Sequence, residues 1–419
     1  MSLPITEPLP PLRNKDWLLA LGLALPFLLS PYAWAFGIPL AALALLGLLL
    51  LLSQMRQQHT ILYEDQGLHV LIRCFLFLWI PMLFSAIDAV DATATWRAIG
   101  LYPACVLAGV GLMAVLRAQP IYRLVSVVLM FLTLFWSLDA ILQAAWGRDL
   151  FGYPLNRLAG ITGHASVYFS EPRDFGFYMG LLSGVTLITI WSAALNRLAR
   201  LFLVPMMAAA VALAGDGAGW IMFLVAMVPY IWLVYVKNTR HPVLSGVFAY
   251  QIFGWILFGL WAWLDPVAHH EGVRKAIQQV SGQHHDLWQA AGNLALHHPL
   301  NGVGAAGFES AEKDHSLVLA ALDVAKDNGP QQVVLQLLAE TGLPGLIGFV
   351  LVWLAFWRLW KASSPLQRQL AAPWVVMLAV MWWPLNAHRS FYALEPAATG
   401  FFLMALAVAS LTHKRGELK

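Results

Sequence analysis

The chain has 419 residues, of which 60% are hydrophobic, 12% aromatic and only 11% charged, and its mean hydropathy is +0.68. Average soluble domains carry about 25% charged residues, so this composition excludes a soluble globular enzyme and predicts a chain embedded in lipid. The formal net charge of +3 is too small to indicate nucleic-acid binding. The two cysteines, Cys74 and Cys105, lie in apolar runs, which excludes a disulfide framework.

Apolar runs of about 17 to 25 residues predict twelve transmembrane helices. In chain order they cover residues 17–33, 36–53, 68–88, 98–116, 121–146, 174–195, 199–215, 218–236, 243–264, 331–356, 370–385 and 396–412. The first run lacks a small-residue cleavage site and a second span follows it closely, so we expect it to remain as an anchor. The predicted fold class is therefore an all-α integral membrane protein.

The basic residues predict the orientation of these helices. Cytoplasmic termini place 16 of the 25 basic residues on the inner side, as the positive-inside rule requires. The other nine fall on the outer side, together with most acidic residues and histidines: Arg97, Arg148, Arg157, Arg173, Arg274, Lys275, Lys313, Lys326 and Arg389. Because these nine break the bias, we expect the polar chemistry of the protein on its outer face.

Two outer loops are long, and they divide the chain into three predicted parts. Residues 1–264 hold the first nine helices and the loop 147–173, residues 265–330 form the second loop, and residues 331–419 hold the last three helices. In the second loop, helical spacing predicts one helix that ends at His298-Pro299 and another over 311–324. We interpret this loop as a small helical cap.

Arginines at an outer lipid surface are suited to phosphate, because the guanidinium fork binds phosphate oxygens bidentately and stays charged. Arg157 and Arg173 in the first long loop, Arg274 in the second and Arg389 in the last are therefore candidates for binding an anionic headgroup, especially a diphosphate. A single interfacial arginine fits ordinary phospholipid phosphates equally well. The hypothesis therefore requires that the four arginines lie close together around one site.

Three acidic residues lie within or at the start of apolar spans, where a buried charge costs several kcal/mol. They are Asp139 in the fifth predicted helix, Asp174 in the sixth and Glu340 in the tenth. Each is expected to pair with one of the outer arginines, either for structure or for catalysis.

Histidine pairs at 269–270, 284–285 and 297–298 raise the alternative of a metal site. Adjacent histidines on a helix point about 100° apart, so one pair does not grip an ion unaided, and no HExxH spacing is present. Interfacial polar roles are the preferred interpretation, and no metal is expected. The sequence also lacks the GxSxG pattern of serine nucleophiles. It has neither a P-loop nor a GxGxxG that follows a predicted strand, so no nucleotide or other cofactor is predicted.

Two segments in the C-terminal third resemble a known family. LALHHPLNGVGAAGF at 294–308 and VVLQLLAETGLPGLIGF at 333–349 are similar to characteristic segments of the O-antigen ligase and O-antigen polymerase superfamily, and the stretch around Arg157 and Arg173 is similar to a third. The resemblance implies a GT-C-like glycosyltransferase of the bacterial inner membrane, with a large helical periplasmic loop between helices 9 and 10. The outer face is then periplasmic.

The ligases of this superfamily share a motif in which a His is followed by Asn, Ser or Gln, then by Gly ten residues later and by Gly, Thr or Tyr three residues beyond that. Gln332, Gly342 and Gly345 fit that motif, whereas Gln331 stands at the position of the His. Glutamine does not act as a general base at neutral pH. We therefore consider two substitutes, His315 beside Asp314 and Arg389 beside His388, and prefer His315 as the base. Gln331 and Glu340 are the other candidate catalytic residues.

The resemblance implies metal-independent transfer of a glycan from undecaprenyl diphosphate to a lipid A-core sugar at the periplasmic face. Its expected partners are that donor, that acceptor and membrane lipids. Polymerases of the superfamily use a second lipid-linked glycan as acceptor and pilin glycosylases use a protein Ser or Thr, while the compact second loop favours the ligase. The missing motif His keeps a different class open, namely a non-catalytic protein that binds a lipid-linked glycan.

Overall fold

The computed structural model describes residues 13–57, 65–118, 120–155, 164–169, 171–192, 197–235, 284–314, 332–384 and 390–413. Over these residues the protein is helical and contains no named strand. The helices are α1 (Asn14–Leu28), α2 (Ala33–Gln57), α4 (Gln66–Ser85), α5 (Ala92–Ala118), α6 (Tyr122–Trp146), α7 (Pro172–Ser192), α8 (Arg197–Ala214), α9 (Gly217–Tyr235), α12 (His284–His297), α13 (Phe308–Asp314), α14 (Val333–Ala362), α15 (Pro365–Met381) and α16 (Leu394–Leu411).

Seven of the described helices, α2, α4, α5, α6, α7, α14 and α16, are long and apolar enough to cross a membrane. A helix satisfies its own backbone hydrogen bonds, which is why an apolar run takes this form in lipid. The protein is therefore an integral membrane protein of helical class. Helices occupy the predicted spans except 243–264, which lies outside the described residues. The number twelve stays a prediction.

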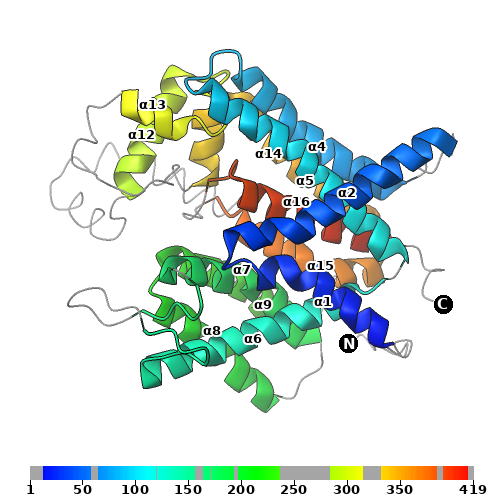
Figure 1. The fold of residues 1–419 in the computed structure, drawn as a ribbon, viewed down its shortest axis with the longest axis vertical. Coiled ribbons are helices and arrows are strands. Elements are labelled where there is room, and N and C mark those ends of the chain that lie inside the picture. Colours follow the sequence, from blue (N-terminus) through cyan, green and yellow to red (C-terminus); the bar gives the residue numbers. More distant parts are fainter. Residues whose placement is uncertain are drawn as a thin grey trace.

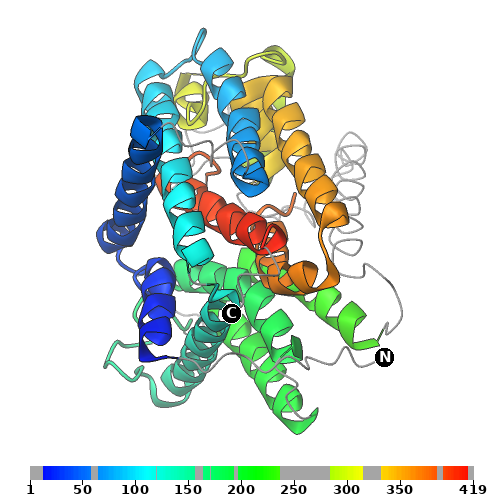
Figure 2. The same ribbon diagram turned by 90° about the vertical axis from the view of Figure 1, so that its right-hand side faces the viewer.

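Two groups of helices are joined through α15 and α16. Helix α16 packs against α5 and α4, which in turn contact α2 and α14, while α15 packs against α16 and α7. Helix α7 contacts α9, α8 and α6 on its other sides. Figures 1 and 2 show α16 between the group containing α4, α5 and α14 and the group containing α6 to α9. The core of the protein therefore follows α15 and α16.

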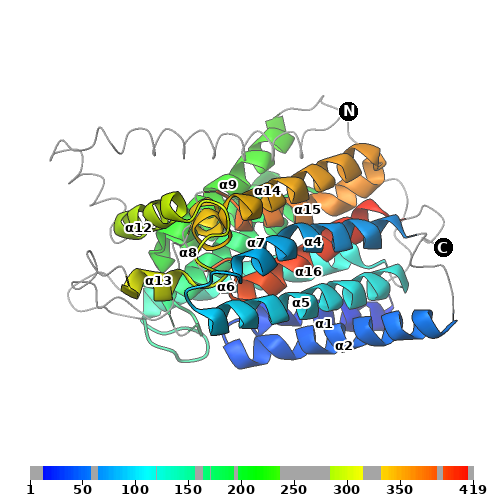
Figure 3. The same ribbon diagram turned by 90° about the horizontal axis from the view of Figure 1, so that it is seen from above.

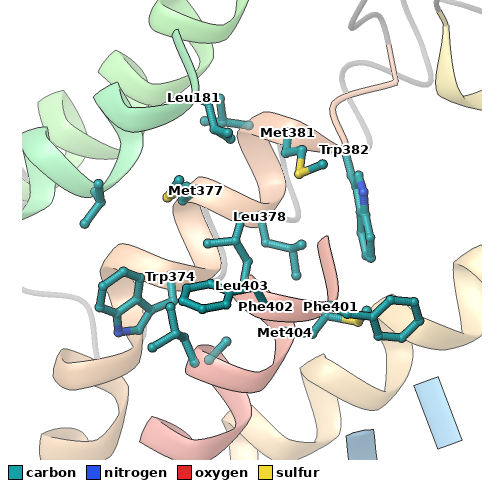
Figure 4. Close-up of a cluster of buried hydrophobic side chains, with 14 of the residues drawn as sticks. Leu181, Trp374, Met377, Leu378, Met381, Trp382, Phe401, Phe402, Leu403 and Met404 are labelled. Atoms are coloured by element: carbon teal, nitrogen blue, oxygen red, sulfur yellow. The ribbon is translucent and has the colours of Figure 1, made fainter. Parts of the chain in front are cut away.

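The side chains of this core come from three helices. Figure 4 shows Trp374 and Met377 of α15 with Leu181 of α7 above them, and Phe401 and Met404 of α16 side by side. Every residue of α16 from Pro396 to Leu411 is buried, as expected for a helix that is apolar on all faces and enclosed by others. By contrast, leucines of α2 are exposed, which suits a helix that faces lipid.

The helices of the second long loop lie at one end of the bundle. Figure 3 shows α12, α13 and the segment that follows α6 at the same end, opposite the C-terminus. Helix α12 ends at His297, just before the predicted break at His298-Pro299, which confirms that boundary. Helix α13 begins at Phe308 rather than at 311, because the chain turns back into a helix directly after Gly304–Gly307. The remainder of the predicted 311–324 helix lies outside the described residues.

Candidate functional site: a broken helix that binds two distant segments

Helix α14 is interrupted at Gly342, which has φ 66° and ψ −164°. This backbone conformation is essentially restricted to glycine. A Cβ at this position would lie 2.5 Å from the carbonyl carbon and oxygen of Leu300. The glycine therefore allows both the break in α14 and the close approach of the loop 299–306.

The break frees backbone groups of α14, and the loop 299–306 binds them. Pro344 has no N–H to donate to the Glu340 carbonyl four residues earlier, and the N–H of Gly304 donates to it instead at 3.0 Å. One residue earlier, the Ala339 carbonyl accepts from the N–H of Val303 at 2.9 Å. In return, the N–H of Leu343 donates to the Pro299 carbonyl at 2.8 Å. The loop thus supplies the hydrogen-bond partners that these backbone groups of α14 lack within the helix.

The Glu340 side chain adds a fourth connection between α14 and this loop. Glu340 is 1% exposed, and its Oε2 accepts from the backbone N–H of Ala306 at 3.0 Å and from Nε2 of Gln336 at 3.2 Å. The expected arginine partner is absent among the described residues, because the backbone N–H of Ala306 in the loop and the side-chain amide of Gln336 in α14 already bind the carboxylate. Glu340 therefore closes the loop onto the helix.

The same loop is fixed from its other side by the connection between α4 and α5. The N–H of Val90 donates to the Val303 carbonyl at 2.9 Å, and the N–H of Ala305 donates to the Ser85 hydroxyl at 3.1 Å. Further along, the Ser310 hydroxyl donates to Asp91, 3.0 Å away. Two hydrogen bonds lower the pKa of Asp91 below its ordinary value: the larger effect comes from the backbone N–H of Ala94 and the smaller from the Ser310 hydroxyl. These contacts join the loop and the start of α13 to the end of α4 and the connection that follows it.

A second distant segment, residues 390–392, binds the same part of α14. Oε1 of Gln336 accepts from the N–H of Phe391 at 2.7 Å, and its Nε2 donates to the Ser390 hydroxyl at 2.5 Å. The hydroxyls of Thr341 and Tyr392 form a hydrogen bond of 2.8 Å. Burial raises the pKa of Tyr392 well above its usual range, so its hydroxyl stays protonated. Gln336 thereby links Glu340 to the segment that follows Arg389 in the sequence.

The described parts of the first long loop are fixed to the end of α6 by Gln143. Its Oε1 accepts from the N–H groups of Ser166 and Val167 at 3.0 and 2.9 Å, and its Nε2 donates to the carbonyls of Tyr153 and Pro154 at 3.3 and 3.2 Å. One amide thus ties together the two chain segments on either side of residues 156–163.

Asp139 contributes to the same arrangement at the end of α6. It is buried, and its Oδ1 accepts from the N–H of Leu150 at 2.8 Å. Among the described residues no arginine pairs with it, since this backbone N–H lies within reach and meets part of its need. The same described part of the chain contains no group of three or more His, Cys, Asp or Glu side chains arranged to hold a metal.

Residues 201–350 match the family model described as O-antigen ligase. This match supports membership of the chain in the O-antigen ligase superfamily. The match runs from α8 into α14 and includes the loop 299–306, Gln336 and Glu340. The two segments by which the sequence resembles the superfamily, 294–308 and 333–349, are thus neighbours in space as well. No curated protein matches the chain.

Of the candidate site residues, Glu340 is the one whose side chain the structure describes. Asp314 ends α13 and Arg173 lies in the first turn of α7, but neither side chain is among those described. The other five candidates lie outside the described residues: His315, Gln331, Arg157, Arg274 and Arg389. The structure therefore leaves their roles as predictions.

Sequence reasoning missed the amide side chains that organise the site. Gln336 lies four residues before Glu340, so the two side chains share one face of α14. Gln143 follows Asp139 at the same spacing in α6. A glutamine one turn from a carboxylate, inside an otherwise apolar run, was the signal available in both cases.

Proposed function

We propose that the chain transfers a glycan, an O-antigen, from undecaprenyl diphosphate to a sugar of lipid A-core. In this proposal the reaction takes place at the periplasmic face of the inner membrane and needs no metal. The observation that carries the proposal is the binding of the loop 299–306 to the broken helix α14 around Glu340, within the region that matches the O-antigen ligase family.

The donor diphosphate would be held by Arg157, Arg173, Arg274 and Arg389. Two of these positions adjoin segments that the structure fixes firmly: Gln336 binds residues 390 and 391 directly after Arg389, and Gln143 binds the chain on both sides of Arg157. Fixed donors of this kind stabilise charge developing on a leaving group by about 3 kcal/mol each. The arginines would thus stabilise the departing lipid diphosphate.

The acceptor hydroxyl needs a base, for which we propose His315 with Asp314 beside it. A correctly placed base contributes about 10²- to 10⁴-fold to the rate. Gln331, at the position of the motif His, would donate a hydrogen bond but take no proton. Because Oε2 of Glu340 already accepts two hydrogen bonds, we assign Glu340 the task of positioning the loop and α14 around the reacting groups.

The proposal is tested by incubating the purified protein with undecaprenyl-diphosphate-linked glycan and three acceptors in turn. Product on lipid A-core supports a ligase, product on a second lipid-linked glycan a polymerase, and product on a serine-containing peptide a protein O-oligosaccharyltransferase. Binding of the donor without any product would support the non-catalytic alternative and overturn the enzyme proposal.

Arginine variants test the diphosphate clamp. Replacing Arg157 or Arg173 by alanine should each reduce transfer at least a hundredfold, which corresponds to roughly 3 kcal/mol of lost transition-state stabilisation. Arg358→Ala is the matched control, because Arg358 is an exposed arginine in the other half of α14 and should be dispensable. Full activity of the Arg157→Ala, Arg173→Ala double variant would remove the clamp from the mechanism.

A further inference from the structure

The first turn of α14 is capped by an unusually long side chain. Gln332 has an extended backbone, with φ −144° and ψ 115°, and its Oε1 accepts from the N–H of Leu335 at 2.5 Å. An amide has one acceptor atom and one donor atom, so this hydrogen bond decides how the Gln332 side chain is oriented. The oxygen faces the helix, and the NH₂ group lies beside it at the helix start.

The NH₂ group of Gln332 is a buried donor without an acceptor. Gln332 is 1% exposed, and its Nε2 has no hydrogen-bond partner among the residues that the structure describes. Leaving a buried donor unpaired destabilises a folded protein, so such a group calls for a reason beyond folding. A ligand bound at the start of α14 would give this donor its acceptor.

The surroundings of this donor favour a negatively charged ligand. The first turns of helices carry unpaired N–H groups and the positive end of the helix dipole, which together attract anions. The first turn of α14 contains Val333, Val334 and Leu335 and no acidic residue, so no carboxylate of its own meets that positive end. A neutral amide donor and a helix N-terminus are the groups with which proteins bind phosphate oxygens without a cation.

We infer that the start of α14, with Gln332 Nε2 as a donor, is a binding site for a phosphate group. The inference rests on the proposed function, in which that phosphate belongs to the lipid diphosphate. Gln332 then has two tasks: its oxygen caps α14 and its nitrogen holds the ligand. The rest of the same helix segment binds the loop 299–306 and residues 390–392, so a phosphate at its start is fixed relative to both.

The test is equilibrium binding of farnesyl diphosphate to the purified full-length protein in detergent. Glu in place of Gln332 keeps an acceptor for Leu335 but replaces the NH₂ group by a second oxygen. Gln332→Glu should weaken binding at least tenfold, about 1.4 kcal/mol, and leave binding of farnesol unchanged. The same loss with inorganic pyrophosphate assigns the site to phosphate itself, and a loss confined to farnesyl diphosphate assigns it to the lipid-linked form. Wild-type binding by the variant, or equal weakening of farnesol, would overturn the inference.

Gln367, in the first turn of α15, offers a matched control. Its Oε1 accepts from the N–H of Ser364 at 2.6 Å at the start of α15, and its Nε2 donates to the His413 carbonyl at 2.6 Å. Gln367→Glu makes the same chemical change at a helix start whose amide donor is already paired, and it should bind like wild type. Gln332→Met, which removes donor and cap together, should also bind weakly and decides the question if Gln332→Glu does not fold.

The two proposals fail separately. If no glycan is transferred but farnesyl diphosphate binding depends on Gln332, the phosphate site stands and the transferase proposal falls. If transfer proceeds and Gln332→Glu binds and turns over like wild type, the phosphate site alone falls.

Discussion

Replacing Gly342 by alanine tests the break in α14 most directly. At φ 66° and ψ −164° an alanine backbone is strained by about 1 to 3 kcal/mol. Its Cβ would also lie 2.5 Å from backbone atoms of Leu300, which move only if neighbouring hydrogen bonds such as Leu343 to Pro299 are lost, at about 0.5 to 1.5 kcal/mol each. Together these terms predict a destabilisation of about 2 to 5 kcal/mol.

The measurement is equilibrium unfolding in mixed micelles with increasing SDS, followed by the fluorescence of the chain's 19 tryptophans. The matched control is Gly292→Ala in α12, where an added Cβ meets nothing within 4 Å. That substitution removes a helical glycine without a clash, so it should stabilise the protein by about 0.5 to 1 kcal/mol. If both variants shifted the free energy of unfolding in the same direction and by similar amounts, the role assigned to Gly342 would be refuted.

Two further predictions concern the contacts around the loop 299–306. Glu340→Leu leaves the buried N–H of Ala306 without an acceptor and removes one of the two acceptors of Gln336 Nε2, so it should destabilise the protein by about 1 to 3 kcal/mol. Glu340→Gln, which keeps an acceptor, should cost clearly less in the same SDS titration. Because the pKa of Asp91 is lowered in the folded protein, its contribution is complete above the ordinary value of 3.8 and is lost as pH falls through the folded pKa. Acid unfolding of Asp91→Asn should therefore depend less on pH below 3.8 than that of wild type, and identical profiles would contradict the assignment.

Much of the fold follows from the sequence, because in lipid a long apolar run has few alternatives to a helix. The observed helix boundaries differ from the predicted ones where a helix extends beyond its apolar run into polar residues. Helix α15 begins at Pro365 rather than at 370, since the Ser364–Gln367 capping box starts it before the apolar residues begin. Helix α14 continues to Ala362, beyond the apolar residues that defined the predicted span.

The candidate site was less accessible to sequence reasoning. The position of Glu340 in a span correctly indicated a buried carboxylate, but the nature of its partners depends on the loop 299–306, more than thirty residues earlier in the chain. An arginine was expected because charge needs compensation in lipid. The loop that docks on the broken helix instead brings the backbone N–H of Ala306 to the carboxylate. Pro344 with Gly342 was the available indication of the break.

The pairing of the loop 299–306 with α14 has a consequence for the biogenesis of the protein. The loop is synthesised before α14. The N–H groups of Val303 and Gly304 therefore have no carbonyl acceptor in α14 until Ala339 and Glu340 have been synthesised. Conversely, α14 enters the bilayer with a gap in its hydrogen bonding that its own residues do not fill. We therefore expect membrane insertion of this helix to depend on docking of the preceding loop.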